Sequence, residues 1–281
     1  MKIIGFADYY ISEWHADNYP AWIKQISEEL GEDFEFRYVW AELDASPKDG
    51  ITTDAWCERM GAQKCSTLSE LCEKCDHVFV LAPSDPQKHL EYAEEVFKYG
   101  KNTYVDKTFA PDCATAEKIF EVAQKYGTKF FSSSALRYST ELDGLEGSNG
   151  VITFGGGSNL DEYIIHQIEM VVKIVGDNGK RVRVEKQGNN QFAVSLEFVN
   201  GKKATMLFDP SFGFGVCAEK SNGASVNRNI TSDFFKGLIK DILVFFKNGV
   251  LPFDPEQTLQ VIRIREGVIK AEHDLGNWIE L

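Results

Sequence analysis

Segments that read as strands alternate with segments that read as helices through the first half of the chain. Strands are predicted at 2–6, 34–40, 77–83, 102–107 and 129–136, and helices at 53–61, 67–75, 86–100 and 113–127, after a first helix that ends at Gly31. The run "HVFVLAP" at 77–83 is apolar throughout and stops at a proline, which is typical of a strand buried on both faces. This alternation predicts a Rossmann-like, doubly wound parallel sheet.

The pattern changes near "LEGSNG" at 145–150, after which strand follows strand. Strands are predicted at 151–157, 181–188, 192–201, 202–209 and 213–220, with helices near 161–175 and at 232–249 and 254–276. Gly-Asn and Asn-Gly pairs between the strands indicate hairpins. We therefore expect a Rossmann-like domain at 1–145 and a mostly antiparallel, open-sheet α+β domain at 146–281. The closing helix, 255–275, is the segment that could pack back on the first domain.

Length, charge and cysteine content restrict the kinds of partner and site that the protein can have. A length of 281 residues suits two domains, and a formal charge of −13 disfavours nucleic acid and anionic membranes as partners. The opening "MKIIGFADYY" lacks the features of a signal peptide, so we expect a cytoplasmic protein with reduced thiols. Cys72 and Cys75 form a CxxC without a second pair, inside a helical pattern, so no metal site is predicted.

Polar residues follow two of the predicted strands of the first domain. Lys107 stands at the end of the strand at 102–107, and "APSDPQKH" begins at the end of the strand at 77–83. Ligands of doubly wound sheets bind at the carboxyl ends of the strands, which favours a role for Lys107 in a ligand site. The alternative is a solvated lysine at a strand end.

The predicted helix near 161–175 carries a histidine between carboxylates. Glu162, His166 and Glu169 are spaced by four and three residues, which places them on one helix face. A histidine flanked by carboxylates suits a general base. The alternative is an ordinary charged helix surface.

The first loop departs from a dinucleotide-binding turn. Aligned from Gly5, the second and third glycines of the fingerprint are replaced by Ala7 and Tyr10, and Asp8 adds a negative charge. Pro20 is best placed in a first helical turn, so the helix is predicted to begin near Asn18, or near Ser12 with a kink at the proline. Either start alters the phosphate cradle, and we expect weak dinucleotide binding.

Acidic residues also follow the second strand. Glu42 or Asp44 could hold ribose hydroxyls, which favours NAD over NADP. The alternative for both is a solvated loop carboxylate.

Three stretches together resemble the glucose–fructose oxidoreductase / inositol dehydrogenase / MocA family. They are "VLAPSDPQKHLEYAEEVFKYGKNTYVDKTFAP", "DEYIIHQIEMVVKIVG" and "PFDPEQTLQVIRIREGVIKAEHDLGNWIEL". The first matches the stretch that leads to the family's Glu-Lys-Pro motif, which reads Asp-Lys-Thr here. The second is similar to its Asp-x-Gly-x-His helix, with Ile164 at the glycine position.

The resemblance implies a nicotinamide dinucleotide, NAD or NADP, on the first domain and a sugar or polyol against the open sheet of the second. It implies that His166 takes the proton of a substrate hydroxyl, that Lys107 stabilises the alkoxide, and that Glu162 stands beside them. Substrate contacts would come from Asp161, Arg137 and Tyr138. Cofactor contacts would come from Gly5, Ala7, Asp8, Glu42, Ala82, Pro83, His89, Asp106 and Lys107. A homodimer or homotetramer is expected, because an open sheet leaves a face to cover.

Three functions follow. The first is an NAD(P)-dependent dehydrogenase or reductase that acts on a sugar-like hydroxyl. The second is a family member with weakened or lost cofactor binding that serves as a sugar-binding or regulatory protein. The third is a non-redox enzyme on the same scaffold. No motif names the substrate.

Overall fold

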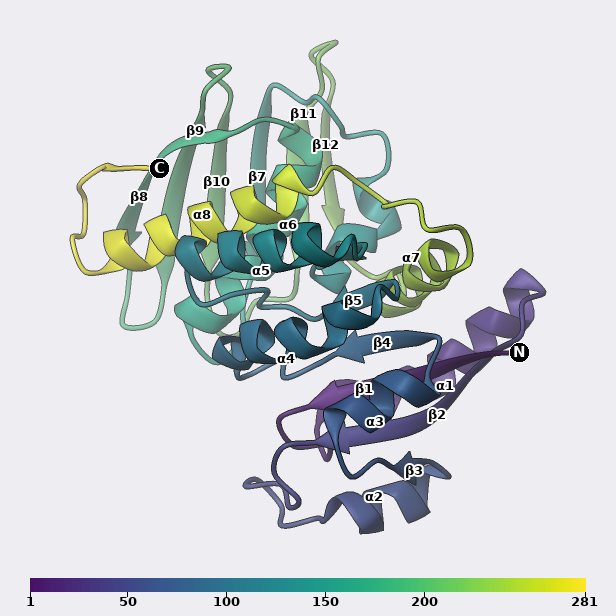
Figure 1. Cartoon of the computed structure of the whole chain (residues 1–281). Helices are drawn as coiled ribbons and strands as arrows, with labels where there is room; N and C mark the ends of the chain where they lie inside the picture. The colour runs from purple at the N-terminus through teal and green to yellow at the C-terminus, as the bar shows by residue number, and fades with distance from the viewer. The chain divides into compact units, whose positions relative to one another are not determined.

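Six parallel strands form the first sheet, in the order β3-β2-β1-β4-β5-β6, in a computed structural model that describes residues 1–281 (Figure 1). The strands are β1 (Lys2–Asp8), β2 (Phe34–Ala41), β3 (Gln63–Lys64), β4 (His77–Val80), β5 (Thr103–Val105) and β6 (Phe130–Phe131). The helices between them are α1 (Trp14–Leu30), α2 (Thr53–Met60), α3 (Leu68–Lys74), α4 (His89–Val96) and α5 (Cys113–Tyr126). This strand order is that of dinucleotide-binding folds, so the predicted Rossmann-like sheet is confirmed.

Several predicted elements are shorter in the structure. The strand at 77–83 ends at Val80, and only Phe130 and Phe131 of 129–136 pair as a strand. The helix at 86–100 is divided into η1 (Pro86–Lys88), α4 and η2 (Phe97–Tyr99). Residues 135–138 and 140–142 form the short 3-10 helices η3 (Ala135–Tyr138) and η4 (Thr140–Leu142). The segments that leave the sheet at its carboxyl edge are thus irregular, which is where ligand-binding loops lie in this fold.

The second sheet has seven strands in the order β12-β11-β7-β10-β9-β8-β13. They are β7 (Gly150–Gly155), β8 (Gly179–Lys186), β9 (Phe192–Phe198), β10 (Lys203–Phe208), β11 (Gly215–Glu219), β12 (Ser225–Asn229) and β13 (Ile279–Glu280). Only β7 and β10 pair in parallel, so the prediction of a mostly antiparallel sheet is confirmed.

Helices α6 (Leu160–Val175) and α8 (Glu256–Glu272) cover one face of this sheet (Figure 1). Val151, Val194 and Met206 on that face are buried, whereas the next residues along the strands, such as Ile152 and Leu207, are exposed. This period of two gives the sheet one packed face and one open face.

The chain divides into two compact units. The first is Met1–Ser133 with Leu238–Asp254, and the second is Ser134–Gly237 with Pro255–Leu281. This division differs from the expected boundary at 145/146, because Ser134 and Arg137 bond to Glu169 on α6. From Leu238 onward α7 (Phe234–Asn248) belongs to the first unit, and α8 belongs to the second.

The CxxC cysteines lie at α3. Cys72 is on the helix and Cys75 ends it, both are buried, and burial raises the pKa of each thiol to about 12. No group of three or more His, Cys, Asp or Glu side chains is arranged to hold a metal ion. None of the helices combines the length and apolar character that a bilayer span requires.

Candidate active site

Lys107 lies at the carboxyl edge of the first sheet, two residues after β5 ends. Its backbone N–H donates to Asp106 Oδ1 at 2.9 Å, and the Tyr104 hydroxyl donates to the same oxygen at 3.1 Å. Asp106 is fully buried, and its Oδ2 is bonded to Nδ1 of His15. Burial raises the pKa of Asp106, but the charges and hydrogen bonds of His15 and Lys107 outweigh burial and hold that pKa below its ordinary value. The peptide bond between Lys107 and Thr108 is cis.

Asp8 ends β1 and points its carboxylate into the interior. Its Oδ1 accepts the N–H groups of Tyr9 at 2.7 Å and Ala82 at 3.0 Å, and its Oδ2 has no hydrogen-bond partner. Ala82 has a φ of 58°, a left-handed conformation that is uncommon for a residue with a side chain. Burial, reinforced by the charge of Glu13, raises the pKa of Asp8 well above its ordinary value.

Helix α1 begins at Trp14, and Glu13 caps it. The Glu13 carboxylate accepts the N–H groups of His15 at 2.9 Å and Ala16 at 2.7 Å. The predicted start near Asn18 is therefore wrong, whereas the alternative start near Ser12 is close to the observed one, with Pro20 inside the helix instead of in its first turn. The capping energy of the side chain sets the start of the helix ahead of the proline. The first N–H groups of α1 are thus already bonded to a carboxylate of the chain.

Glu42 follows β2 and is also engaged within the unit. Its two oxygens accept bonds from Lys88 Nζ and the Tyr92 hydroxyl, each at 2.7 Å. The Lys88 ammonium lies 5.3 Å from the centre of the Tyr9 ring. Asp44, the alternative ribose ligand, pairs with Lys64 at 2.6 Å. Both acids that could hold ribose hydroxyls therefore have partners inside the first unit.

The turn between β1 and α1 does not fit a pyrophosphate. Gly5 serves packing, since a Cβ there would lie 2.4 Å from Cys75 Sγ and 2.7 Å from Leu71 Cδ1. Where a phosphate would meet free N–H groups at a helix start, Glu13 holds those groups. Asp8 adds a second carboxylate at the same turn, and both lie close enough to Asp106 for its charge to raise their pKa values.

The remaining predicted cofactor residues lie in the segment after β4, except for Ala7 on β1. His89 is fully buried, with Nδ1 2.9 Å from the carbonyl of Phe109 and Nε2 bonded to the carbonyl of Leu81. Burial lowers the pKa of His89. Pro83 is half-buried, and Ala7 is fully buried within β1. His89 thus joins the segment that follows β4 to the segment that follows β5.

In the second unit, His166 lies on α6 and is held by a serine that the sequence reading missed. The Ser134 Oγ is 2.7 Å from His166 Nδ1, and the Ser134 N–H donates to Glu169 Oε1 at 3.0 Å. Arg137 bonds to the other oxygen of Glu169 at 3.1 Å, and both of these side chains are buried. Burial raises the pKa of Glu169 although Arg137 opposes it. The run of three serines at 132–134, directly after a strand, was the only available signal.

The other predicted residues of this unit are engaged elsewhere. Asp161 pairs with Arg265 at 2.5 Å, and Glu162 bonds to the capping residue Asn159. Tyr138 is half-buried against Gly237, where a Cβ would lie 2.8 Å from the Tyr138 Cβ. The structure therefore brings His166, Glu169 and Arg137 together through Ser134, and directs the carboxylates of Asp161 and Glu162 to other partners.

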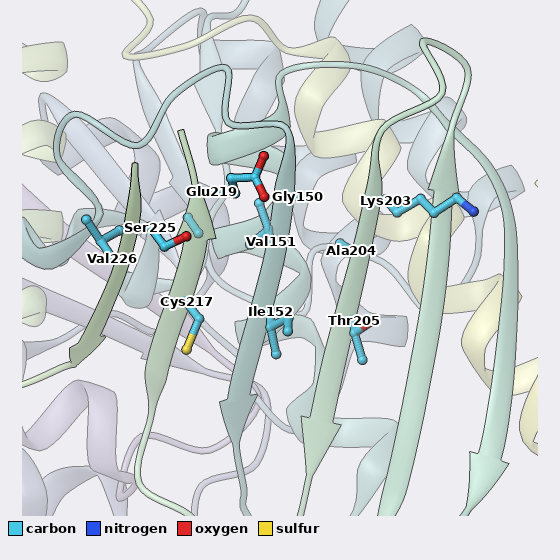
Figure 2. Close-up of a pocket in the computed structure, with 11 residues that line it drawn as sticks. Gly150, Val151, Ile152, Lys203, Ala204, Thr205, Cys217, Glu219, Ser225 and Val226 are labelled. Carbon is cyan, nitrogen blue, oxygen red and sulfur yellow. The ribbon is translucent and has the colours of Figure 1, made fainter. Parts of the chain in front are cut away.

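The open face of the second sheet carries a hollow of about 360 Å³ (Figure 2). Cys217, Ile152 and Thr205 are direct neighbours across three strands along its floor. Beyond them Gly150 lies between Glu219 and Lys203, and its missing side chain leaves the space. A second hollow of about 630 Å³ is lined by Phe154, Leu207, Phe212 and Phe214, among others. None of the predicted site residues lines either hollow.

Comparisons with known proteins support the fold and the family. Residues 28–134 match the model of GFO_IDH_MocA, described as "Oxidoreductase family, NAD-binding Rossmann fold". No curated protein matches the chain.

Solved structures are similar over nearly the whole chain. A probable dehydrogenase from Thermotoga maritima has a TM-score of 0.81 at 12% identity, covering 99% of this chain and 98% of its own. GenD2 from gentamicin A biosynthesis, in complex with NAD, has a TM-score of 0.79 at 14% identity, covering 100% and 97%. Aldose-aldose oxidoreductase from Caulobacter crescentus, complexed with glycerol, has a TM-score of 0.74 at 16% identity, covering 100% of both chains. At these identities the likeness shows a shared fold. With this shared fold, the match over residues 28–134 confirms the resemblance seen in the motifs: that part of the chain matches the GFO_IDH_MocA family of NAD-binding oxidoreductases.

Proposed function

We propose that the protein is an oxidoreductase that interconverts a hydroxyl and a carbonyl group on a sugar- or polyol-like substrate. The observation that carries the proposal is Lys107, half-buried at the carboxyl edge of the first sheet two residues after β5 ends, where ligands of doubly wound sheets bind. The Caulobacter enzyme, which is named for aldoses and holds glycerol, supports this substrate class. A nicotinamide dinucleotide supplies or accepts the hydride in such reactions.

In this proposal Lys107 and His166 act on the reacting oxygen. A lysine ammonium stabilises a developing alkoxide, and either the lysine or the histidine exchanges a proton with that oxygen while the other donates a hydrogen bond to it. Arg137 and Asp161 are committed to ion pairs with Glu169 and Arg265, so we assign them to the ordering of α6 instead of to substrate contact. Glu162 supports the first turn of the same helix.

We propose weak binding of the dinucleotide, held away from the turn between β1 and α1, with NAD preferred over NADP. The misfit of Asp8 and Glu13 to a pyrophosphate supports weak binding, and the position of Glu42 after β2, although its carboxylate is bonded to Lys88 and Tyr92, supports the preference for NAD. Calorimetry with NAD and NADP tests the preference, which equal or reversed affinities would contradict.

We propose a homodimer or homotetramer assembled through the open face of the second sheet. Ile152 on β7 and Leu207 on β10 are 44% and 37% exposed there, so two neighbouring strands each present an apolar side chain on the open face. A second copy of the same face would cover both.

The test of the activity is a panel of polyols, inositols and aldoses assayed with NAD and with NADP, followed by the absorbance of the reduced nicotinamide. We expect turnover with at least one member of the panel. A ligand that stabilises the protein in thermal-shift experiments but gives no turnover with either dinucleotide would contradict the proposal.

Stabilisation by a ligand without turnover would favour another function, that of a sugar-binding or regulatory protein that no longer uses a dinucleotide. The specific observation in its favour is the closed turn, in which Glu13 holds the N–H groups at the start of α1. The two functions differ in one measurement, since only the enzyme gains stability from added NAD(H).

A further inference from the structure

Ser134 contacts two side chains of α6 at once. Its hydroxyl oxygen lies 2.7 Å from His166 Nδ1, and its N–H donates to Glu169 Oε1 at 3.0 Å. Glu169 is held in turn by the Arg137 guanidinium. Because His166 and Glu169 are three residues apart on one helix and Ser134 is fully buried, the hydroxyl is fixed relative to the imidazole ring.

The proton of this hydroxyl decides which ring nitrogen carries a proton. A serine hydroxyl has one hydrogen to donate and two lone pairs that accept. One lone pair accepts the N–H of Leu136 at 3.3 Å, and His166 Nδ1 is the other partner of the oxygen. If the hydroxyl donates to Nδ1, the hydroxyl hydrogen has an acceptor and Nδ1 has a donor.

The opposite arrangement leaves a buried hydrogen without an acceptor. If Nδ1–H donated to the serine, Oγ would accept two hydrogen bonds and its own hydrogen would have no acceptor among the contacts of Ser134. The cost of a buried unsatisfied donor shifts an equilibrium on the order of ten- to a hundred-fold. The tautomer with a bare Nδ1 is therefore strongly preferred.

We infer that Ser134 holds neutral His166 in the tautomer that carries its proton on Nε2, so that His166 donates a hydrogen bond to the substrate oxygen. The part concerning substrate rests on the proposed function, whereas the tautomer does not. This role differs from that of the base which the family resemblance implies. Proton exchange then belongs to Lys107, whose ammonium gives a proton to the oxygen during reduction and whose amine takes it back during oxidation. Ser134 is thus a positioning residue that acts through His166.

The test is nitrogen NMR of the protein labelled with ¹⁵N-histidine, because long-range proton–nitrogen correlations distinguish the two neutral tautomers. The chain has five histidines, and His166→Gln identifies the signals of His166 by their loss. In the wild-type protein above neutral pH, we expect Nε2 protonated and Nδ1 bare. A protonated Nδ1 in the neutral ring would overturn the inference.

Two variants separate positioning from general loss of structure. Ser134→Ala removes the donor, and we expect a mixture of tautomers with at least a several-fold larger share of the Nδ1–H form. Ser134→Thr keeps a hydroxyl and should restore the single wild-type form. Ser139→Ala is the matched control, because Ser139 is equally buried and its hydroxyl has no hydrogen-bond partner. Identical His166 signals in Ser134→Ala and Ser139→Ala would contradict the inference.

The spectra need neither substrate nor cofactor, so the outcome is independent of the proposed function. If the protein shows the expected tautomer but no oxidoreductase activity, the proposed function is contradicted and the role of Ser134 is not. If Ser134→Ala fails to fold, the spectra of the wild type and of Ser134→Thr still test the tautomer. A protonated Nδ1 in the neutral ring of either protein contradicts the inference.

Discussion

Nδ1 of His15 is bonded to Oδ2 of Asp106, although the two residues are 91 positions apart in the chain. His15 lies on the first turn of α1 and Asp106 directly follows β5, so the bond ties the helix start to the carboxyl edge of the sheet. Glu13 and Asp8 complete the same region with bonds to backbone N–H groups. The place where a Rossmann fold offers donors to a pyrophosphate is therefore filled by acids of the chain itself.

Asp8→Asn should stabilise the fold at neutral and alkaline pH. The pKa of Asp8 is raised in the folded state, chiefly by burial, so its contribution to stability is fully present below the unfolded pKa and is lost as the pH rises through the folded pKa. An amide keeps the bonds to Tyr9 and Ala82 and carries no charge to repel Glu13. We expect a gain on the order of 1 kcal/mol at pH 8 in urea unfolding, shrinking at lower pH.

The control for this variant is Asp85→Asn, whose carboxylate bonds to Gln87 at the surface. It should leave stability unchanged across the same pH range. A loss of stability in Asp8→Asn at pH 8 would show that the native state needs the charge of Asp8.

Glu13→Ser should tighten the binding of NAD. Serine is a strong N-cap, so the start of α1 is kept while the carboxylate that holds the N–H groups of His15 and Ala16 is removed. Removing one charge near a pyrophosphate is worth about 1 kcal/mol, or roughly five-fold in Kd, and more at low salt. Asp8→Asn should act in the same direction. Calorimetry measures both, and a sub-micromolar Kd of the wild-type protein for NAD would contradict the closed turn.

Most of the architecture could be predicted from apolar patterning, because strands buried on both faces must be continuous apolar runs. Residues 77–80 are all buried, as their composition predicts. In contrast, β12 was missed because its sequence, Ser225–Asn229, is polar and lies on the edge of the second sheet with no residue fully buried. Nothing in its side chains signals a strand that is held by backbone pairing to β11.

The site was predictable only where a residue follows a strand or keeps a helical spacing, as Lys107 and His166 do. The roles of Glu13 and Ser134 depend on which N–H groups and ring atoms come within bonding distance in three dimensions. Asp8 was expected to face a ligand but is buried, and its carboxylate accepts the N–H of Ala82, whose left-handed conformation no sequence pattern predicts.

His77 should make the protein sensitive to acid. Its ring stacks on Phe246 at 4.3 Å between centres, and burial lowers its pKa from 6.5 to about 4. In the unfolded chain His77 therefore binds a proton below pH 6.5, whereas in the folded chain it binds one only below about pH 4. The stability of the fold falls as the pH drops through this window. The loss should total on the order of 3 kcal/mol. The free energy of unfolding of His77→Phe, measured in urea, should fall less between pH 7 and pH 5 than that of the wild type does.

Ile152→Lys should dissociate the proposed oligomer. Ile152 lies on the open sheet face, flanked across the strands by Cys217 and Thr205 (Figure 2). A lysine there would be solvated in a monomer but buried without a partner between two copies, which is costly. Light scattering should report an oligomer for the wild type and a monomer for the variant. Val199→Lys, an equally apolar and 66% exposed position in the turn after β9, should not change the mass. A wild-type monomer at micromolar concentrations would contradict the assembly.

Lys107→Met should leave the fold intact and abolish turnover. The side chain of Lys107 is half-buried after β5, and methionine preserves its apolar stem, so the melting temperature should stay close to that of the wild type. Loss of the ammonium that stabilises the alkoxide should lower kcat by at least about a hundred-fold. Lys98→Met is the matched control, because Lys98 forms only a surface pair with Glu95 at 2.7 Å and should keep wild-type kcat. A Lys107→Met protein with wild-type kcat on the same substrate would remove Lys107 from the reaction, and with it the proposed division of roles between Lys107 and His166.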